Sequence, residues 1–384
     1  MITISAVGML NALGNNADEV AGNLARGHAP GMGPDSVWRL GEKCCWTGRV
    51  TGPLPAVPDA LAAHNSRNNR LLMAALAQIR PEVEQAIARV GAARVAVVLG
   101  TSTSGLDEAD QFVSRGLPGY RYAQQELGDP SRFLARLLGL RGPAYTLSTA
   151  CSSSARALIS GARLIRAGLA DMAIVGGADT LSRMPVNGFD SLASLSSHRC
   201  TPFSTHRDGI TIGEGSALML IGRNTGGVAL RGWGESSDAH HISAPHPQGD
   251  GAIRAISMAL RSAGLQPQQV GYINLHGTAT RLNDQIEAQV IATLFGDGVP
   301  ASSTKHLTGH MLGAAGIGEA ALGWLLLTRP LPLPPQDFSQ DPLDESLPRC
   351  GLLTAPAPLG RRCVLSNSFA FGGNNACLIL GDAP

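Results

Sequence analysis

Short apolar runs alternate with longer amphipathic stretches along most of the chain. The apolar runs predict strands over residues 2–8, 94–100, 144–148, 172–176, 217–222, 228–232, 271–275, 362–366 and 375–380. Apolar residues at three- and four-residue spacing predict helices over residues 17–26, 70–90, 152–167, 251–263, 285–294 and 311–328. Strands that alternate with helices are typical of mostly parallel sheets covered by helices. The pattern therefore predicts a layered α/β protein.

Two pairs of segments from the two halves of the chain resemble each other. RVAVVLGTSTSG (94–105) and QVGYINLHGTATRLND (269–284) are both apolar strands that enter a Gly-Thr turn before a helix. YTLSTACSSSARAL (145–158) and ASSTKHLTGHMLGAAG (301–316) both place a turn of small residues before an apolar helix. We interpret these pairs as an internal duplication of a β/α unit, whose two copies face each other across one site.

The glycine-rich segment GRNTGG, residues 222–227, separates the two copies and is typical of a connector. We therefore expect an N-terminal half over residues 1–225 and a C-terminal half over residues 226–384.

Composition limits the partners that the chain can bind. Of its 384 residues 44% are hydrophobic and 15% are charged, and 30 basic residues nearly balance 29 acidic ones. With a net charge of +1, no overall field attracts nucleic acid or an anionic membrane. The start, MITISAVGML, has no basic region of a signal peptide, and no apolar run approaches the roughly 20 residues of a membrane span. We expect neither a nucleic-acid partner nor a membrane span.

The cysteines are odd in number and irregularly spaced. They are Cys44, Cys45, Cys151, Cys200, Cys350, Cys363 and Cys377. Their spacing matches neither a metal site nor the disulfide framework of a small secreted domain. We therefore expect reduced thiols, a cytoplasmic location and no bound metal.

One cysteine lies where a strand-like run becomes helical, in LSTACSSSARALISGARLIRAG, residues 147–168. Cys151 is predicted at or just before the first helical turn, where free backbone N–H groups and the helix dipole favour a thiolate. We expect a lowered pKa and, because small serines follow, a sulfur that substrate can reach. A buried structural cysteine is the alternative, since cysteine is among the most buried residue types.

Two histidines and a lysine follow in the second half. His276 ends an apolar strand, the place where α/β sheets put their ligands, although a histidine that only caps a turn fits equally well. Lys305 is one of only two lysines and is followed by His310 and by a glycine-studded helix that carries Glu319. A carboxylate on an apolar helix needs a cationic partner, and Lys305 is the candidate. A solvated loop around Lys305 is the alternative.

The segment NSFAFGGNN, residues 367–375, lies between two predicted strands. It fits an ordinary hairpin turn or a mobile gate whose N–H groups point into a pocket. The thiol, the two histidines and the lysine together favour covalent thiol catalysis over metal chemistry, and a Cys-His hydrolase fits these residues too.

Five segments in a fixed order resemble one enzyme family. They are STACSSS, CTPFSTHRDGITIGEGSA, HGTATRLND, STKHLTGHMLGAAG and NSFAFGGNN. The chain resembles the β-ketoacyl-acyl carrier protein synthases of the thiolase superfamily, the condensing enzymes of fatty-acid and polyketide elongation. The resemblance implies a five-layered αβαβα fold of two related halves and a reaction that needs neither metal nor organic cofactor.

The resemblance also implies a role for each motif residue. Cys151 is implied as the nucleophile that accepts the acyl group. His276 and His310 are implied in decarboxylation of malonyl-carrier protein and in condensation, which lengthens the chain by two carbons. Lys305 matches the motif lysine, and Glu319 matches the glutamate after it.

The gate and the pocket carry departures from the family pattern. Phe371 matches the gating phenylalanine whose backbone N–H contributes to the oxyanion hole. Ala370 stands where the family usually has glycine, which restricts the backbone, and Asn374 replaces the usual threonine. Thr103 is expected to face the acyl pocket.

The resemblance implies protein partners as well. An acidic carrier protein should meet a local basic patch, for which Arg67, Arg70 and Arg207 are candidates, although ordinary surface arginines are the alternative. A homodimer, or a heterodimer with a related subunit, is expected. Other functions left open are a thiolase, which would have a second cysteine in place of one histidine, and a non-elongating subunit that sets chain length.

Overall fold

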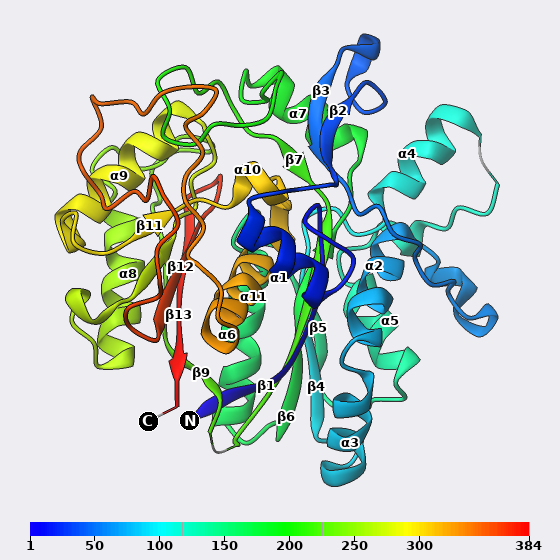
Figure 1. The fold of residues 1–384 in the computed structure, drawn as a ribbon. Coiled ribbons are helices and arrows are strands. Elements are labelled where there is room, and N and C mark those ends of the chain that lie inside the picture. The colour runs from blue at the N-terminus through cyan, green and yellow to red at the C-terminus, as the bar shows by residue number, and fades with distance from the viewer. Residues whose placement is uncertain (117, 225, 384) are drawn as a thin grey trace.

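The computed structural model describes residues 1–116, 118–224 and 226–383. There the chain forms one ten-stranded sheet in the order β11-β10-β12-β13-β9-β1-β8-β6-β4-β5. The first half supplies β1 (Ile2–Leu10), β4 (Val95–Gly100), β5 (Ala144–Leu147), β6 (Met172–Asp179) and β8 (Gly215–Gly222). The second half supplies β9 (Val228–Ser237), β10 (Tyr272–Asn274), β11 (Ala301–Ser302), β12 (Cys363–Phe369) and β13 (Asn374–Asp382). The two sets lie side by side in Figure 1.

The two halves of the sheet repeat one topology. The order β5-β4-β6-β8-β1 has the same pattern of parallel and antiparallel pairs as β11-β10-β12-β13-β9. Only three residue pairs join the halves, where the start of β1 meets β9. The strands β4 and β10 hold equivalent positions, as the similar sequence segments predict, so the duplication is confirmed. The boundary expected at residue 225 falls on a residue outside the described part of the chain.

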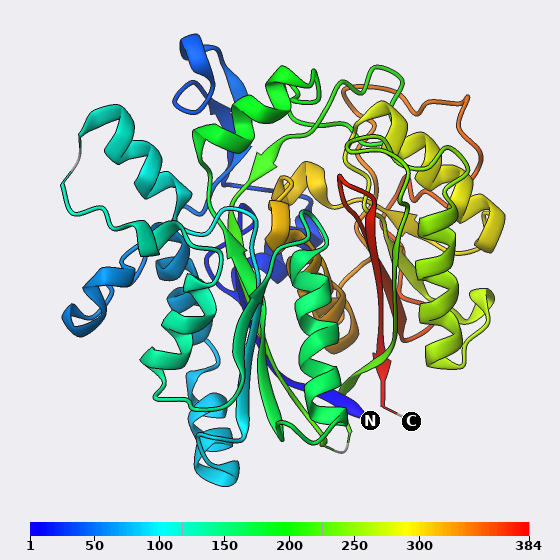
Figure 2. The same cartoon turned by 180° about the vertical axis from the view of Figure 1, so that it is seen from behind.

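Helices form three layers around the two half-sheets (Figures 1 and 2). The middle layer contacts strands of both halves and consists of α6 (Ser153–Arg166) and α11 (Ala315–Thr328). The outer helices of the first half are α2 (Arg67–Ala77), α3 (Arg80–Val90) and α5 (Asp129–Leu137). The outer helices of the second half are α8 (Asp250–Ala263) and α9 (Arg281–Phe295). The five-layered αβαβα prediction is therefore confirmed.

The largest apolar core lies between the half-sheets, around α6 and α11. Helix α11 is apolar on every side because protein covers it from both directions. The remaining helices are α1 (Ala17–Arg26), α4 (Leu106–Arg115), α7 (Arg183–Ser191) and α10 (Lys305–Thr308). Short 3₁₀ turns are η1 (Leu40–Glu42), η2 (Asp59–His64), η3 (Tyr122–Gln125), η4 (Pro267–Gln269) and η5 (Leu312–Ala314). A small sheet contains β2 (Met32–Asp35), β3 (Cys45–Gly48) and β7 (Ile212–Gly213).

Two predictions about the elements were wrong. The sheet is not mostly parallel, since five of its nine neighbouring pairs are antiparallel, including the β12–β13 hairpin. The single helix expected over 70–90 is two helices, because Pro81 lacks an N–H and its ring would clash with the preceding turn. Within the described residues, none of the helices combines the length and the apolar character needed to cross a bilayer.

Candidate active site

Cys151 lies in the tight turn between β5 and α6. Ala150 before it has a φ of 51°, a left-handed conformation that its small side chain tolerates. The Ser153 hydroxyl holds the turn, because it donates to the Ala150 carbonyl (2.6 Å) and accepts from the Thr149 N–H (2.8 Å). Gly100 at the end of β4 lets the start of α6 approach closely, since a Cβ there would lie 2.3 Å from the Ser154 nitrogen. This packing presents the sulfur at the start of the helix.

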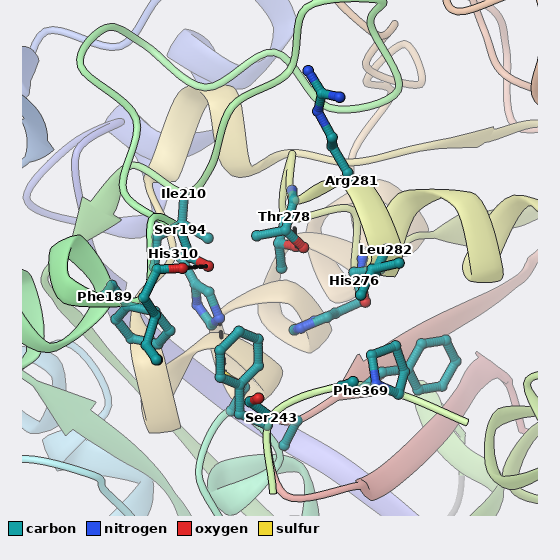
Figure 3. Close-up of a pocket in the computed structure, with 18 of the residues that line it drawn as sticks. Phe189, Ser194, Ile210, Ser243, His276, Thr278, Arg281, Leu282, His310 and Phe369 are labelled. Atoms are coloured by element: carbon teal, nitrogen blue, oxygen red, sulfur yellow. Dashed lines mark hydrogen bonds between the residues drawn. The ribbon is translucent and has the colours of Figure 1, made fainter. Parts of the chain in front are cut away.

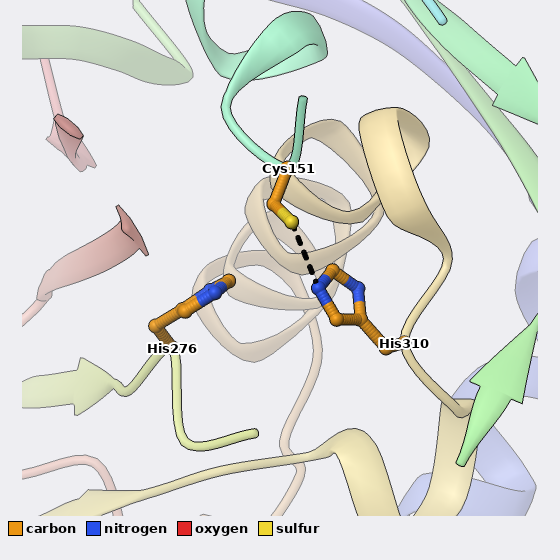
Figure 4. Close-up of side chains that lie close together, drawn as sticks. All are labelled: Cys151, His276 and His310. Atoms are coloured by element: carbon orange, nitrogen blue, oxygen red, sulfur yellow. Dashed lines mark hydrogen bonds between the residues drawn. The ribbon is translucent and has the colours of Figure 1, made fainter. Parts of the chain in front are cut away.

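His276 and His310 reach the same sulfur from the other half of the chain. His276 follows β10, and its backbone N–H donates to the buried carboxylate of Glu287 on α9 (2.8 Å). His310 follows α10, and its N–H donates to the Thr211 carbonyl (2.7 Å). The two rings are perpendicular, with centroids 5.4 Å apart. Nε2 of His310 lies 3.1 Å from Sγ of Cys151, as Figure 4 shows.

The hydrogen bonds at Nδ1 determine the tautomer of each ring. The backbone N–H of Leu312 donates to Nδ1 of His310 (3.1 Å), and Nζ of Lys305 lies 3.4 Å from Nδ1 of His276. Since both Nδ1 atoms accept, the proton of each neutral ring is on Nε2. Lys305 is held by a buried ion pair with Glu319. Both imidazoles therefore present an N–H donor to the space beside the sulfur.

Burial keeps both imidazoles uncharged. It lowers the pKa of His276 and of His310 well below 6.5, and the nearby Lys305 charge lowers both further. A neutral imidazole can donate a hydrogen bond to an oxyanion through its Nε2–H, so the ring does not have to gain a proton first.

This electrostatic state predicts the pH dependence of the decarboxylation step. Because a lowered pKa delays protonation to acidic pH, the rate should stay constant from about pH 8 down to about pH 6. Single-turnover carbon dioxide release from malonyl-carrier protein, measured on enzyme already acylated, isolates this step. A rate that halves near pH 6.5 would contradict the assignment.

The pKa of Cys151 is raised, whereas the sequence predicted a lowered one. Burial raises the pKa of Cys151 to about 11, although the Lys305 charge and the N–H groups of Phe371 and Cys151 itself favour the thiolate. The N–H of Cys151, just before the helix, does supply one donor, but the loss of water outweighs the favourable contacts. The resting sulfur is therefore a protonated thiol, and its proton must leave as an acyl group arrives.

Cys151, His276 and His310 could in principle hold a metal, since their ligand atoms lie within 4.8 Å of one another. A histidine that binds a metal through Nε2 normally donates its Nδ1–H to an acceptor. Here both Nδ1 atoms face donors instead, so both Nε2 atoms carry protons. This set of donors suits an oxyanion better than a cation.

The three residues share a cavity of about 350 Å³, shown in Figure 3. Phe371, in the turn between β12 and β13, lines it and packs edge-on against Phe189 of α7, with ring centroids 5.2 Å apart. Thr278 and Thr280 also line the cavity. Sequence reasoning missed Phe189 and both threonines as separate candidates, although the threonines lie within the HGTATRLND motif.

Known families match both halves of the chain. The N-terminal domain of beta-ketoacyl synthases matches residues 1–225, and the C-terminal domain matches residues 228–336. The chain belongs to the beta-ketoacyl synthase family. Over 98% of its length it is 29% identical to 3-oxoacyl-[acyl-carrier-protein] synthase 2 of Synechocystis sp., covering 97% of that protein.

Solved ketosynthases share its fold. A chain in the complex of the ketosynthase ApeO with its chain length factor ApeC from Xenorhabdus doucetiae is 64% identical, with a TM-score of 0.98. The match covers 100% of this chain and 98% of that one. A chain of the ishigamide ketosynthase/chain length factor is 26% identical with a TM-score of 0.86, over 100% and 99% of the two chains.

The NSFAFGGNN segment of this synthase is both a hairpin turn and part of the cavity wall. The Ala370 N–H donates to the Asn374 carbonyl, and the Gly373 N–H donates to the Ala370 carbonyl (both 2.9 Å). Gly372 and Gly373 have φ values of 86° and 77°, which favour glycine. The hairpin turn that the sequence suggested is thus confirmed, with Phe371 at its tip, and a gating movement stays a prediction.

The three arginines proposed for carrier docking all have partners within the synthase. Arg207 is only 5% exposed and is paired with Asp344 (2.7 Å). Arg67 pairs with the buried carboxylate of Glu214 (2.5 Å). Arg70 donates to backbone carbonyls of the segment before η2. Arg207 is therefore buried, whereas Arg67 and Arg70 stay partly exposed, and a role of these arginines in carrier docking stays a prediction.

Thr103 is not among the residues that line the cavity around Cys151. It is buried, and its hydroxyl donates to the Asp179 carboxylate (2.6 Å). The same carboxylate accepts from the N–H of Ala314 (3.0 Å), so Thr103 helps to join the first half to the start of α11. A contact with the acyl chain stays a prediction.

The Lys305–Glu319 pair predicts a stability effect that a double variant reverses. Lys305→Met should lower the free energy of unfolding by about 3–5 kcal/mol, because it leaves a buried carboxylate without its partner. Lys305→Met/Glu319→Leu should recover most of that loss, since both charges are removed. Denaturant unfolding of the native, single-variant and double-variant chains measures both effects. Equal losses in the single and double variants would contradict the pairing argument.

Proposed function

We propose that this synthase catalyses decarboxylative Claisen condensation between an acyl group on Cys151 and malonyl-carrier protein. The product is a β-ketoacyl chain two carbons longer, as in fatty-acid, polyketide or polyene-type biosynthesis. One observation carries the proposal: a thiol from the first half and two Nε2–H imidazoles from the second half face one cavity. A thiolase would place a second cysteine here, whereas the second side chain beside Cys151 is His310.

In the first half-reaction the sulfur of Cys151 attacks the thioester carbonyl of an acyl-carrier protein. The bond from the carbonyl carbon to the carrier's sulfur breaks, and the departing thiolate takes the proton that Cys151 loses. The N–H groups of Cys151 and Phe371 are placed to hold the oxyanion, each contributing about 3 kcal/mol to the transition state. The acyl group then remains on Cys151.

In the second half-reaction malonyl-carrier protein loses carbon dioxide. The electrons of the broken carbon–carbon bond form an enolate, whose thioester oxygen accepts hydrogen bonds from Nε2–H of His276 and His310. The enolate carbon attacks the acyl carbonyl and releases the thiolate of Cys151, which takes up a proton from water and becomes the resting thiol again. Lys305, paired with Glu319, orients His276 through Nδ1 and holds its tautomer. The residues supply donors and positioning, and no step requires a metal or cofactor.

The partners follow from the reaction and from the relatives. A carrier protein delivers both thioesters. A second, related subunit is supported by the likeness to the ApeO–ApeC complex, and β5 provides a partly exposed strand at one edge of the sheet. Reduced cysteines support a cytoplasmic location. We also propose that residues 1–225 and 226–384 act as two halves, of which the first supplies the thiol and the second supplies the histidines.

Incubation with acyl-carrier protein and malonyl-carrier protein tests the proposal. Mass spectrometry should find a carrier that bears the β-ketoacyl product, together with one equivalent of carbon dioxide. Release of free fatty acid without consumption of malonyl-carrier protein would indicate a hydrolase instead.

A further inference from the structure

We propose that the carrier protein docks on an apolar rim around the mouth of the active-site cavity, formed by Leu192, Ile242 and Leu282 with Arg281 beside them. The inference rests on the proposed function and specifies how its protein substrate is recognised. It names a different surface from the three arginines that the sequence suggested.

The three apolar side chains are exposed although they come from separate parts of the chain. Leu192 directly follows α7 and is 55% exposed, and Leu282 in the first turn of α9 is 54% exposed. Both line the cavity that holds Cys151. Ile242 is 84% exposed and precedes Ser243, which lines the same cavity. Exposed apolar side chains gathered at one opening are typical of an interaction site.

Arg281 gives this rim a free positive charge. Its side chain is exposed and lines the cavity mouth, and no carboxylate of the described residues lies within ion-pair distance of it. Figure 3 shows the guanidinium pointing away from His276 and His310. The buried Arg207, in contrast, is already paired with Asp344. Arg281 is therefore available to an acidic partner, whereas Arg207 is not.

The continuity of the rim with the cavity identifies its occupant. Leu192, Arg281 and Leu282 belong at once to the surface and to the wall of the space that reaches the thiol. A permanently bound subunit would cover this entrance, whereas a carrier protein must approach it to deliver its thioester arm. Three apolar side chains and one cation form a small contact, which suits a partner that has to dissociate after each transfer.

A comparison of two acyl donors tests the rim. Donors are acyl-carrier protein and the small thioester acyl-pantetheine, and the readout is the ratio of their kcat/KM values for acylation of Cys151. We expect Ile242→Asp and Leu282→Asp each to lower the ratio of kcat/KM for acyl-carrier protein to kcat/KM for acyl-pantetheine about tenfold. Because both donors react at the same thiol, damage to the site itself cancels in the ratio.

A matched control and a salt series complete the test. Leu169→Asp changes a leucine that is 57% exposed and does not line the cavity, so the native ratio should persist. Arg281→Glu should lower the ratio at low salt, and about 0.5 M salt should reduce this effect because it screens charges beyond a few ångströms. Native ratios in both Ile242→Asp and Leu282→Asp would overturn the docking site. Failure of native enzyme to be acylated by either donor would instead overturn the proposed function.

Discussion

Cys151→Ala should take up no acyl group from acyl-carrier protein, whereas the native chain should gain the mass of one acyl group. The physical reason is that the sulfur of Cys151 lies beside the backbone N–H groups of Cys151 and Phe371 and faces the cavity. Removal of the nucleophile should lower acyl transfer by at least about 10³-fold, below detection. Intact-mass measurement after incubation with the acyl donor checks this result.

Cys200→Ala is the matched control for this prediction. Cys200 is also buried and burial also raises its pKa to about 11, but it does not line the cavity. This variant should acquire the acyl group as the native chain does. An adduct that still forms on Cys151→Ala would show that another residue is the nucleophile.

His310→Ala should accumulate the acyl-enzyme and fail to consume malonyl-carrier protein. The loss of one Nε2–H donor to the enolate oxygen should lower decarboxylation about 10²–10³-fold. Acyl transfer should survive because the N–H groups of Cys151 and Phe371 remain. Quenched time courses that follow acyl-enzyme mass and carbon dioxide together separate the two half-reactions.

His306→Ala provides the corresponding histidine control. His306 is four positions before His310 and is also buried, and burial lowers its pKa to about 4. Its Nδ1–H donates to the Ser303 carbonyl, and the residue does not line the cavity. The turnover of His306→Ala, corrected for the fraction of folded protein, should equal that of the native chain. Normal turnover of His310→Ala would remove His310 from the mechanism.

Local patterns predicted the elements well because they depend on neighbours in the sequence. The strand expected over 94–100 is β4, and the helix expected over 17–26 is α1. Pro81 could have predicted the break between α2 and α3, but the apolar spacing continues across it and favoured a single helix. The mixture of parallel and antiparallel strands could not be predicted from local patterns, because it depends on pairing between strands that are far apart in the chain.

In the active site, too, the sequence predicted the residues of local motifs but not the contacts between distant parts of the chain. The motifs identified Cys151, His276, His310 and Lys305, which the structure brings together, but not the exposed rim or the internal partners of Arg67. A basic residue has the same sequence signature whether it meets solvent or a buried carboxylate.

The sequence by itself determined the chemical groups, the repeated β/α unit and the family, because composition, periodicity and motif order are properties of the chain alone. Only the tertiary structure decided which atoms meet and in which protonation state. Cys151 and His310 are 159 positions apart, yet their side chains are in contact. The raised thiol pKa and the neutral imidazoles come from burial by both halves, a property that no single segment possesses.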